Sequence, residues 1–146
     1  MKFTCSVTIQ KPRQIVADYF ADPQYLGEYQ EGFQKKELIS GEAGQEGAVS
    51  KILYAEGKRK MELTETILKN NLPEEFLGQY HHKNMDNTMR STFTALSDQE
   101  TQYNAEIHYT AFRGFTVKAM VFLFPSLFKK QVQTWLNNFK AFVENQ

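Results

Sequence analysis

The side chains best suited to chemistry in this sequence are polar residues at strand positions that are expected to face the interior of the protein. They are Glu65, Tyr80, His82, Tyr109 and Arg113. Successive side chains of a strand point to opposite faces, so parity places each of these residues on the side that carries the apolar positions. A carboxylate there must be paired, hydrogen-bonded or protonated, because unpaired burial costs several kcal/mol.

Two interpretations of Glu65 follow from this placement. Its carboxylate could orient a bound ligand or act as a general base. It could equally form a structural Glu–Arg or Glu–Tyr pair near the open end of the sheet. Tyr80 and Tyr109 likewise have two interpretations: they contact a ligand, or they are core rings whose hydroxyls are hydrogen-bonded within the protein. His82 lies near a hairpin end, where it would be solvated.

Several familiar catalytic and cofactor motifs are missing. His81 and His82 are neighbours on a strand and point to opposite faces, and with His108 they are too few for a metal site. There is no HExxH, CxxC, GxSxG or dinucleotide-binding glycine pattern. The glycines of Gly41-x-x-Gly44-x-x-Gly47 are not followed by GK[ST] or by a helix. We therefore expect no metal, no cofactor and no assignable catalytic residue.

The composition describes a globular chain of 146 residues with 12 Phe and 7 Tyr. So many rings serve core packing or the lining of a cavity for an apolar ligand. Seventeen basic and seventeen acidic residues give a net charge of zero, which favours neither nucleic acid nor a charged membrane as a partner. The single cysteine, Cys5, falls on the apolar face of a strand, where a buried, inert thiol is expected. With no apolar signal segment, a soluble cytoplasmic protein is predicted.

The segment from Phe115 to Glu144 has the period of one helix face. Its apolar residues recur every three or four positions, about 3.6 on average, at Val117, Val121, Phe124, Phe128, Val132, Trp135, Phe139 and Phe142. Pro125 predicts a kink or break in this long helix. Because the stripe keeps its phase across Pro125, we expect the helix to bend there more than to change direction. Phe124, Phe128 and Trp135 are its candidate ligand contacts, and the Pro125 turn is the candidate cavity mouth.

The rest of the chain is typical of strands joined by short turns. Lys2–Ile9 alternates between apolar and polar residues, Pro12 opens a first short helix, and Asp22–Pro23 caps a second. From Phe33 to Arg113 six more strands follow, with hairpin turns predicted at Asp86–Asn87 and at residues 98–100. In this register Phe93 lies on the inward face with Tyr80. The prediction is an α+β fold, a curved seven-stranded antiparallel sheet wrapped round the C-terminal helix.

This order of elements resembles the START-like, helix-grip superfamily, which includes the birch-pollen-allergen-like proteins. The residues that carry the resemblance are the helix from Pro12 to Phe20 with Asp22–Pro23 after it, the glycine-spaced loop, and the terminal Phe-Lys-Ala-Phe-Val-Glu. It covers essentially the whole chain, 1–146, as a single START-like domain. Within the superfamily the sequence is similar to the polyketide cyclase/dehydrase and lipid-transport group (SRPBCC).

The resemblance implies an apolar cavity between the sheet and the long helix that holds a hydrophobic small molecule or lipid. A non-catalytic carrier or sensor is favoured, because no catalytic set of the family can be placed on this chain. The alternatives are a polyketide cyclase- or dehydratase-like enzyme that uses cavity Tyr and Glu residues, and a chaperone-linked interaction module. We expect a monomer or weak homodimer, no nucleic-acid partner and no stable membrane insertion. The candidate ligand-binding residues are Glu65, Tyr80, His82, Phe93, Tyr109, Arg113, Phe124, Phe128 and Trp135.

Overall fold

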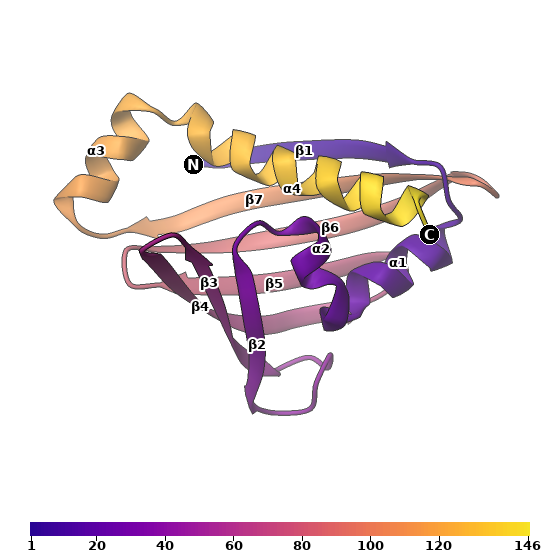
Figure 1. The fold of residues 1–146 in the computed structure, drawn as a ribbon, viewed down its shortest axis with the longest axis horizontal. Coiled ribbons are helices and arrows are strands. Elements are labelled where there is room, and N and C mark those ends of the chain that lie inside the picture. Colours follow the sequence, from indigo (N-terminus) through magenta and orange to yellow (C-terminus); the bar gives the residue numbers. More distant parts are fainter.

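The computed structural model describes residues 1–146, and its main element is one antiparallel sheet of seven strands (Figure 1). The order across the sheet is β1-β7-β6-β5-β4-β3-β2, so β1 joins the far edge beside the last strand and the others form a meander. The strands are β1 (Lys2–Ile9), β2 (Phe33–Ser40), β3 (Val49–Glu56), β4 (Arg59–Asn71), β5 (Glu75–His82), β6 (Met85–Ser97) and β7 (Glu100–Phe112). The predicted α+β sheet is confirmed.

Helices lie on one side of this sheet. Between β1 and β2 the chain forms α1 (Arg13–Ala21), the 3-10 turn η1 (Pro23–Tyr25) and α2 (Leu26–Tyr29). The carboxylate of Asp22 accepts the backbone N–H of Gln24 at 3.0 Å, and Pro23 stands at the first helical position, which confirms the predicted cap. After β7 come α3 (Phe115–Leu123) and the long α4 (Ser126–Glu144), which runs along β1 with α2 packed against it (Figure 1).

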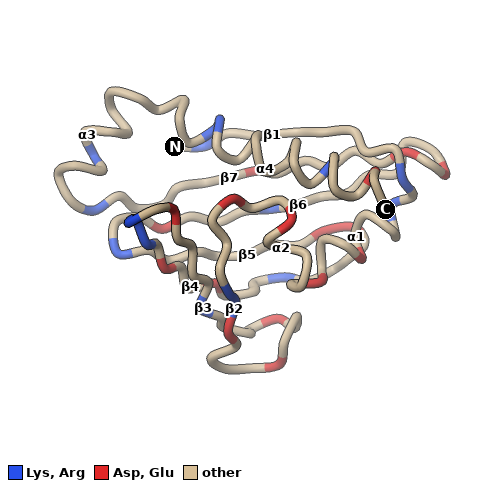
Figure 2. The backbone as a smooth tube through the Cα atoms, viewed as in Figure 1, with Lys and Arg blue, Asp and Glu red and all other residues tan.

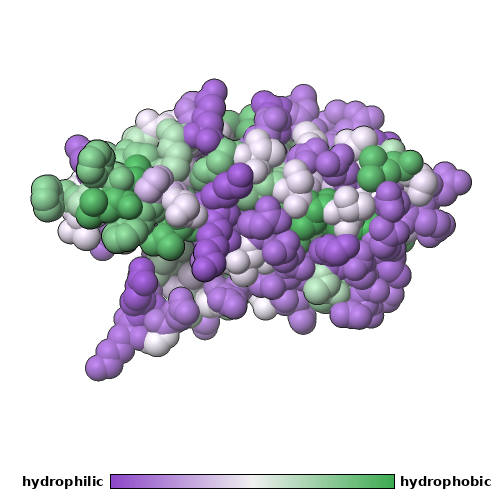
Figure 3. All heavy atoms as spheres, turned by 90° about the horizontal axis from the view of Figure 1, so that it is seen from above, coloured by the Kyte–Doolittle hydropathy of each residue, from purple (hydrophilic) through white to green (hydrophobic).

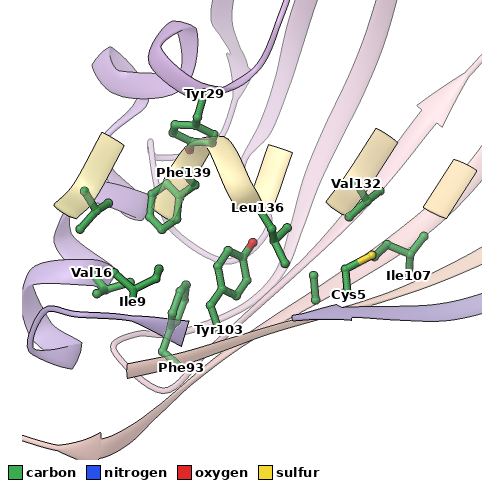
Figure 4. Packing of buried hydrophobic residues seen from close by; sticks show 12 residues of the cluster. Cys5, Ile9, Val16, Tyr29, Phe93, Tyr103, Ile107, Val132, Leu136 and Phe139 are labelled. Atoms are coloured by element: carbon green, nitrogen blue, oxygen red, sulfur yellow. The ribbon is translucent and has the colours of Figure 1, made fainter. Parts of the chain in front are cut away.

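The core lies between α4 and the sheet. Figure 4 shows side chains of the helix, among them Val132, Leu136 and Phe139, facing Phe93 and Tyr103 of the sheet. All five are buried, and Cys5 is buried beside them. The apolar stripe of the sequence therefore does face the sheet from Phe128 onward.

The structure has the break predicted at Pro125, but the expectation that the helix bends there more than it changes direction was wrong. The chain breaks at Phe124 and Pro125, where Phe124 has φ −135° and ψ 55°, and α3 leaves in a different direction from α4 (Figure 1). Proline disfavours helical geometry at the residue before it and supplies no N–H. No residue of α3 is buried, so Val117, Val121 and Phe124 do not belong to the core. A hydrophobic period describes a face within each helix and carries no information on whether two successive helices are collinear.

The predicted hairpin turns were also misplaced. The β5–β6 turn is Lys83–Asn84, with His82 paired to Met85, and the β6–β7 turn is Asp98–Gln99, with Ser97 paired to Glu100. The predicted pairing of Tyr80 with Phe93 is replaced by Tyr80 with Asn87. Both registers are shifted by an even number of residues, so no side chain changed face.

Candidate functional site

Glu65 is the one carboxylate buried on the inner face, with 5% of its surface exposed. It stands directly opposite Tyr80 in the β4–β5 ladder, and the Tyr80 hydroxyl donates to Oε2 at 2.9 Å. Lys36, reaching from β2, brings its Nζ to 2.7 Å from Oε1. Both oxygens of Glu65 therefore have a partner, one neutral donor and one cation. The Glu–Tyr pair was among the predicted arrangements, whereas Lys36 was not foreseen.

A group of buried tyrosines surrounds this pair. Burial, together with the charge of Glu65 and its hydrogen bond, raises the pKa of Tyr80 well above its usual value. Burial first and the Glu65 charge second also raise the pKa of Tyr54. Burial raises the pKa of Tyr103, whose hydroxyl lies 3.1 Å from the Ser91 hydroxyl. At neutral pH these tyrosines are un-ionised, and each hydroxyl is able to donate a hydrogen bond.

Tyr54 connects the Glu65 group to α4. Its ring stacks on Trp135, with centroids 5.8 Å apart and planes inclined by 14°, and its hydroxyl donates to Oε1 of Gln30 at 2.8 Å. The indole Nε1 of Trp135 is buried and has no hydrogen-bond partner. Buried donors are nearly always satisfied, and an unmade bond costs about 1–3 kcal/mol. Trp135 thus presents a free N–H donor on the sheet side of α4.

Gly78 decides how Tyr80 lies. It precedes Tyr80 by two residues on the same face of β5, and a Cβ at Gly78 would stand 2.6 Å from the Tyr80 hydroxyl oxygen. The ring can occupy this position only because residue 78 has no side chain. Sequence reasoning did not select Gly78, although an isolated glycine inside a strand is a recognised sign of a close approach.

His82 and Arg113 lie at the β5–β6 hairpin end. Arg113 forms two 2.8 Å bonds from its guanidinium to the Asp86 carboxylate and also donates to the carbonyl of His82. Nδ1 of His82 accepts the Asn84 N–H at 3.1 Å, and burial together with nearby cations lowers its pKa. Arg113 is thus engaged in holding the hairpin against the end of β7, away from Glu65.

Comparison with known proteins was informative only at the level of structure. No family model matches the chain, and no curated protein matches its sequence. A conserved protein from Geobacillus kaustophilus is 14% identical with a TM-score of 0.81, covering 99% of this chain and 96% of that one. The Zhui aromatase/cyclase from Streptomyces sp. R1128 is 11% identical with a TM-score of 0.80, covering 99% and 93%.

A third similar structure is norcoclaurine synthase from Thalictrum flavum in complex with dopamine and hydroxybenzaldehyde. It is 10% identical with a TM-score of 0.72, covering all of this chain and 87% of that one. The chain has the helix-grip fold. The predicted arrangement of the sheet and the long C-terminal helix is confirmed, and identities this low concern the fold alone.

In this helix-grip structure the remaining candidates are aromatic and lie apart from Glu65. Phe93 is a core residue whose ring packs on Phe20 and Tyr103. Tyr109 packs on Phe128 of α4 with centroids 5.3 Å apart, and burial raises its pKa to about 12. Phe124 is 56% exposed at the break between α3 and α4.

The structure has a hollow beside Tyr54. Its volume is about 670 Å³, and its lining combines hydrophobic residues such as Met61 with polar ones such as His82, between the β3–β4 and β5–β6 turns. Tyr54 is thus shared by this hollow and by the buried group of Glu65 and Trp135. The residues brought together around Tyr54 are Lys36, Glu65, Tyr80 and Trp135.

Proposed function

We propose that this protein binds a hydrophobic small molecule that carries a polar oxygen, and that it does so between the sheet and α4 as a carrier or sensor. The observation that supports this most strongly is the free Nε1–H of Trp135 beside the ring of Tyr54. An apolar wall with a few convergent polar groups is the usual composition of a small-molecule site. Here the rings would contact the apolar body, and the indole N–H would donate to the ligand oxygen.

Glu65 supports the proposal as a positioning residue. Its carboxylate holds the Tyr80 hydroxyl at 2.9 Å and the Lys36 ammonium at 2.7 Å. Held in place in this way, the Tyr80 ring presents a defined surface, and its un-ionised hydroxyl is a fixed polar group next to the tyrosine cluster. Preorganised contacts lose less conformational freedom on binding.

An enzymatic use of the same residues is the second candidate. It is favoured by the direct Tyr80–Glu65 hydrogen bond, since a carboxylate and a hydroxyl in contact can relay a proton, and by the likeness in fold to an aromatase/cyclase. The raised pKa of Tyr80 weighs against it. An acid–base group works best with a pKa near the operating pH, whereas this hydroxyl keeps its proton and is suited to donating a hydrogen bond.

The experiment begins with native mass spectrometry of protein purified from its own host. A co-purifying apolar compound is expected, and its addition to stripped protein should change the fluorescence of Trp135, the only tryptophan of the chain. Tyr80→Phe should weaken this response, and Tyr25→Phe, at a tyrosine without a hydroxyl hydrogen bond, is the matched control. If no apolar compound co-purifies and none of a panel of lipids and polyketides alters Trp135, the proposal is wrong. If the protein instead converts the compound into a product, the second candidate function, an enzyme, is the correct one.

A further inference from the structure

Helix α3 is apolar on nearly all sides and yet has no buried residue. Its sequence, FTVKAMVFL, contains only Thr116 and Lys118 as polar positions. Phe115 is 88% exposed and Phe122 is 85% exposed. A helix that is hydrophobic all round is ordinarily buried in a large core or in a membrane. Val117, Ala119 and Val121 are half-buried, and the other residues of α3 are exposed.

The exposed surface continues past the break at Pro125. Leu123, Phe124 and Leu127 are each at least half exposed, and Figure 3 shows hydrophobic residues gathered at the end of the molecule that carries α3. We call Phe115, Met120, Phe122, Leu123, Phe124 and Leu127 the α3 patch. Contiguous exposed apolar patches mark interaction surfaces in soluble proteins.

The segment that carries the α3 patch has charges of one sign only. Between Glu106 and Glu144 the sequence contains no Asp or Glu, and its charged residues there are Arg113, Lys118, Lys129, Lys130 and Lys140. Figure 2 shows Lys and Arg on α3 and on the turns at the same end. Arg113 is paired with Asp86 and Lys140 with Glu144, so the unpaired cations of this segment are Lys118, Lys129 and Lys130, and they make it locally basic.

A contact ties one further basic turn to this end. The β5–β6 turn is joined to the start of α3 because the N–H of Arg113 donates to the carbonyl of Asn84 at 2.7 Å. Lys83 of that turn lines a hollow together with Lys60 and Glu62 of β4. The β5–β6 turn thus adds one further cation, Lys83, near the start of α3.

We propose that the α3 patch docks reversibly on an anionic lipid surface. Apolar rings rimmed by Lys and Arg are the pattern of helices that lie in the headgroup region of a bilayer. None of the helices has the length and apolar character to span a membrane. With nine residues α3 extends about 14 Å, half of the hydrocarbon thickness, so it lies in the interface. The break at Pro125 lets α3 do so without moving α4 from the sheet.

A second copy of the chain fits the α3 patch less well. In a two-fold dimer the same patch meets itself, and the cations around one copy would then face those around the other. Like charges brought together cost free energy and disfavour the contact. An anionic lipid surface offers an apolar phase and opposite charge at once.

The test is co-sedimentation of the full chain with vesicles of phosphatidylcholine, with and without one-quarter phosphatidylserine. Binding is expected only with phosphatidylserine, and it should weaken as salt is raised. Phe115→Ser combined with Phe122→Ser should reduce partitioning at least about tenfold, because two large apolar side chains no longer enter the lipid. Lys118→Glu should reduce it about fivefold or more.

The control variants make the same kinds of change, loss of an exposed apolar side chain and reversal of a positive charge, at the other end of the molecule. Leu96→Ser removes an exposed apolar side chain of β6, and Arg13→Glu reverses a charge at the start of α1; both should bind vesicles as the parent does. Circular dichroism melts of the Phe115/Phe122 variant should match the parent. Absence of binding to phosphatidylserine vesicles, or equal losses in control and patch variants, overturns the proposal. So does a dimer in vesicle-free buffer that the Phe115/Phe122 variant converts to a monomer, which would assign the patch to self-association.

Discussion

The ring of Tyr80 lies over Gly78, so closely that a Cβ at residue 78 would come within 2.6 Å of the hydroxyl oxygen and 2.9 Å of two ring carbons. The same hydroxyl is held at 2.9 Å by Glu65 on the neighbouring strand. The absence of one methyl group in β5 thus permits the hydrogen bond that pairs the buried carboxylate in β4. Any side chain at residue 78 must displace the ring or the strand.

Gly78→Ala should destabilise the protein by about 1–3 kcal/mol, the usual cost of overpacking. Because the obstacle is the Tyr80 ring, the same substitution should cost little in a Tyr80→Ala background. Urea unfolding of the two single variants and the double variant measures this coupling, which we expect to be about 1 kcal/mol or more. Gly27→Ala is the control, since a Cβ there meets only an ordinary contact at 3.6 Å. Additive effects of Gly78→Ala and Tyr80→Ala would show that the two residues are independent.

Glu65→Gln and Tyr80→Phe preserve volume, so both variants should fold. Each should weaken binding of the co-purifying apolar compound by about 1–3 kcal/mol, because a buried partner loses its hydrogen bond. Titration followed by the fluorescence of Trp135 measures the affinity. Unchanged binding in both variants would make the Glu65 group purely structural.

Two phenylalanines of the C-terminal stripe should behave differently. Phe139 is 1% exposed in the core, and Phe139→Ala should cost about 3–5 kcal/mol. Phe124 belongs to the same sequence stripe but lies on the surface, so Phe124→Ala should change the free energy of unfolding by no more than about 0.5 kcal/mol. Lys130→Ala, at an exposed position of α4, should match Phe124→Ala. Thermal or denaturant unfolding decides this, and equal losses at Phe124 and Phe139 would contradict the placement of α3.

Asp86→Asn should alter the acid stability of the protein. Hydrogen bonds from Arg113, and then from His81, lower the pKa of Asp86 from 3.8 to about 2. A carboxylate with a depressed folded-state pKa stabilises the fold above its unfolded pKa and loses that contribution as the pH falls through the folded value. The parent should therefore melt modestly higher than Asp86→Asn at pH 7, and the difference should disappear between pH 3.8 and about 2.

Asp98→Asn, in the β6–β7 turn, is the control for this titration. Its carboxylate makes no hydrogen bond or ion pair in the structure, so at pH 7 this variant should melt at the same temperature as the parent. A constant difference between the parent and Asp86→Asn down to pH 2 would mean that the charge of Asp86 is not what stabilises the hairpin.

The sequence by itself determined those features that depend only on the residues within one strand or one helix. The alternation of apolar and polar residues correctly placed Glu65 and Tyr80 on the inner face of the sheet. The hairpin turns were predicted at the wrong residues, but a register shift by an even number of residues leaves every side chain on the same face. The cap at Asp22 and Pro23 depends on neighbouring residues only. The period of α4 located the helix face that meets the sheet, and the order of elements indicated the helix-grip fold.

Only the tertiary structure decided what lies opposite those faces. Lys36 reaches Glu65 from β2, past the intervening strand β3, and such a pair depends on the curvature of the sheet and the length of the lysine side chain. Pro125 was visible in the sequence, but the direction of α3 beyond it was not, because the stripe continues in phase through a break that frees α3 from the core. The importance of Gly78 depends on where the Tyr80 ring lies. A sequence encodes which way a side chain points, whereas its partners depend on how distant segments pack together.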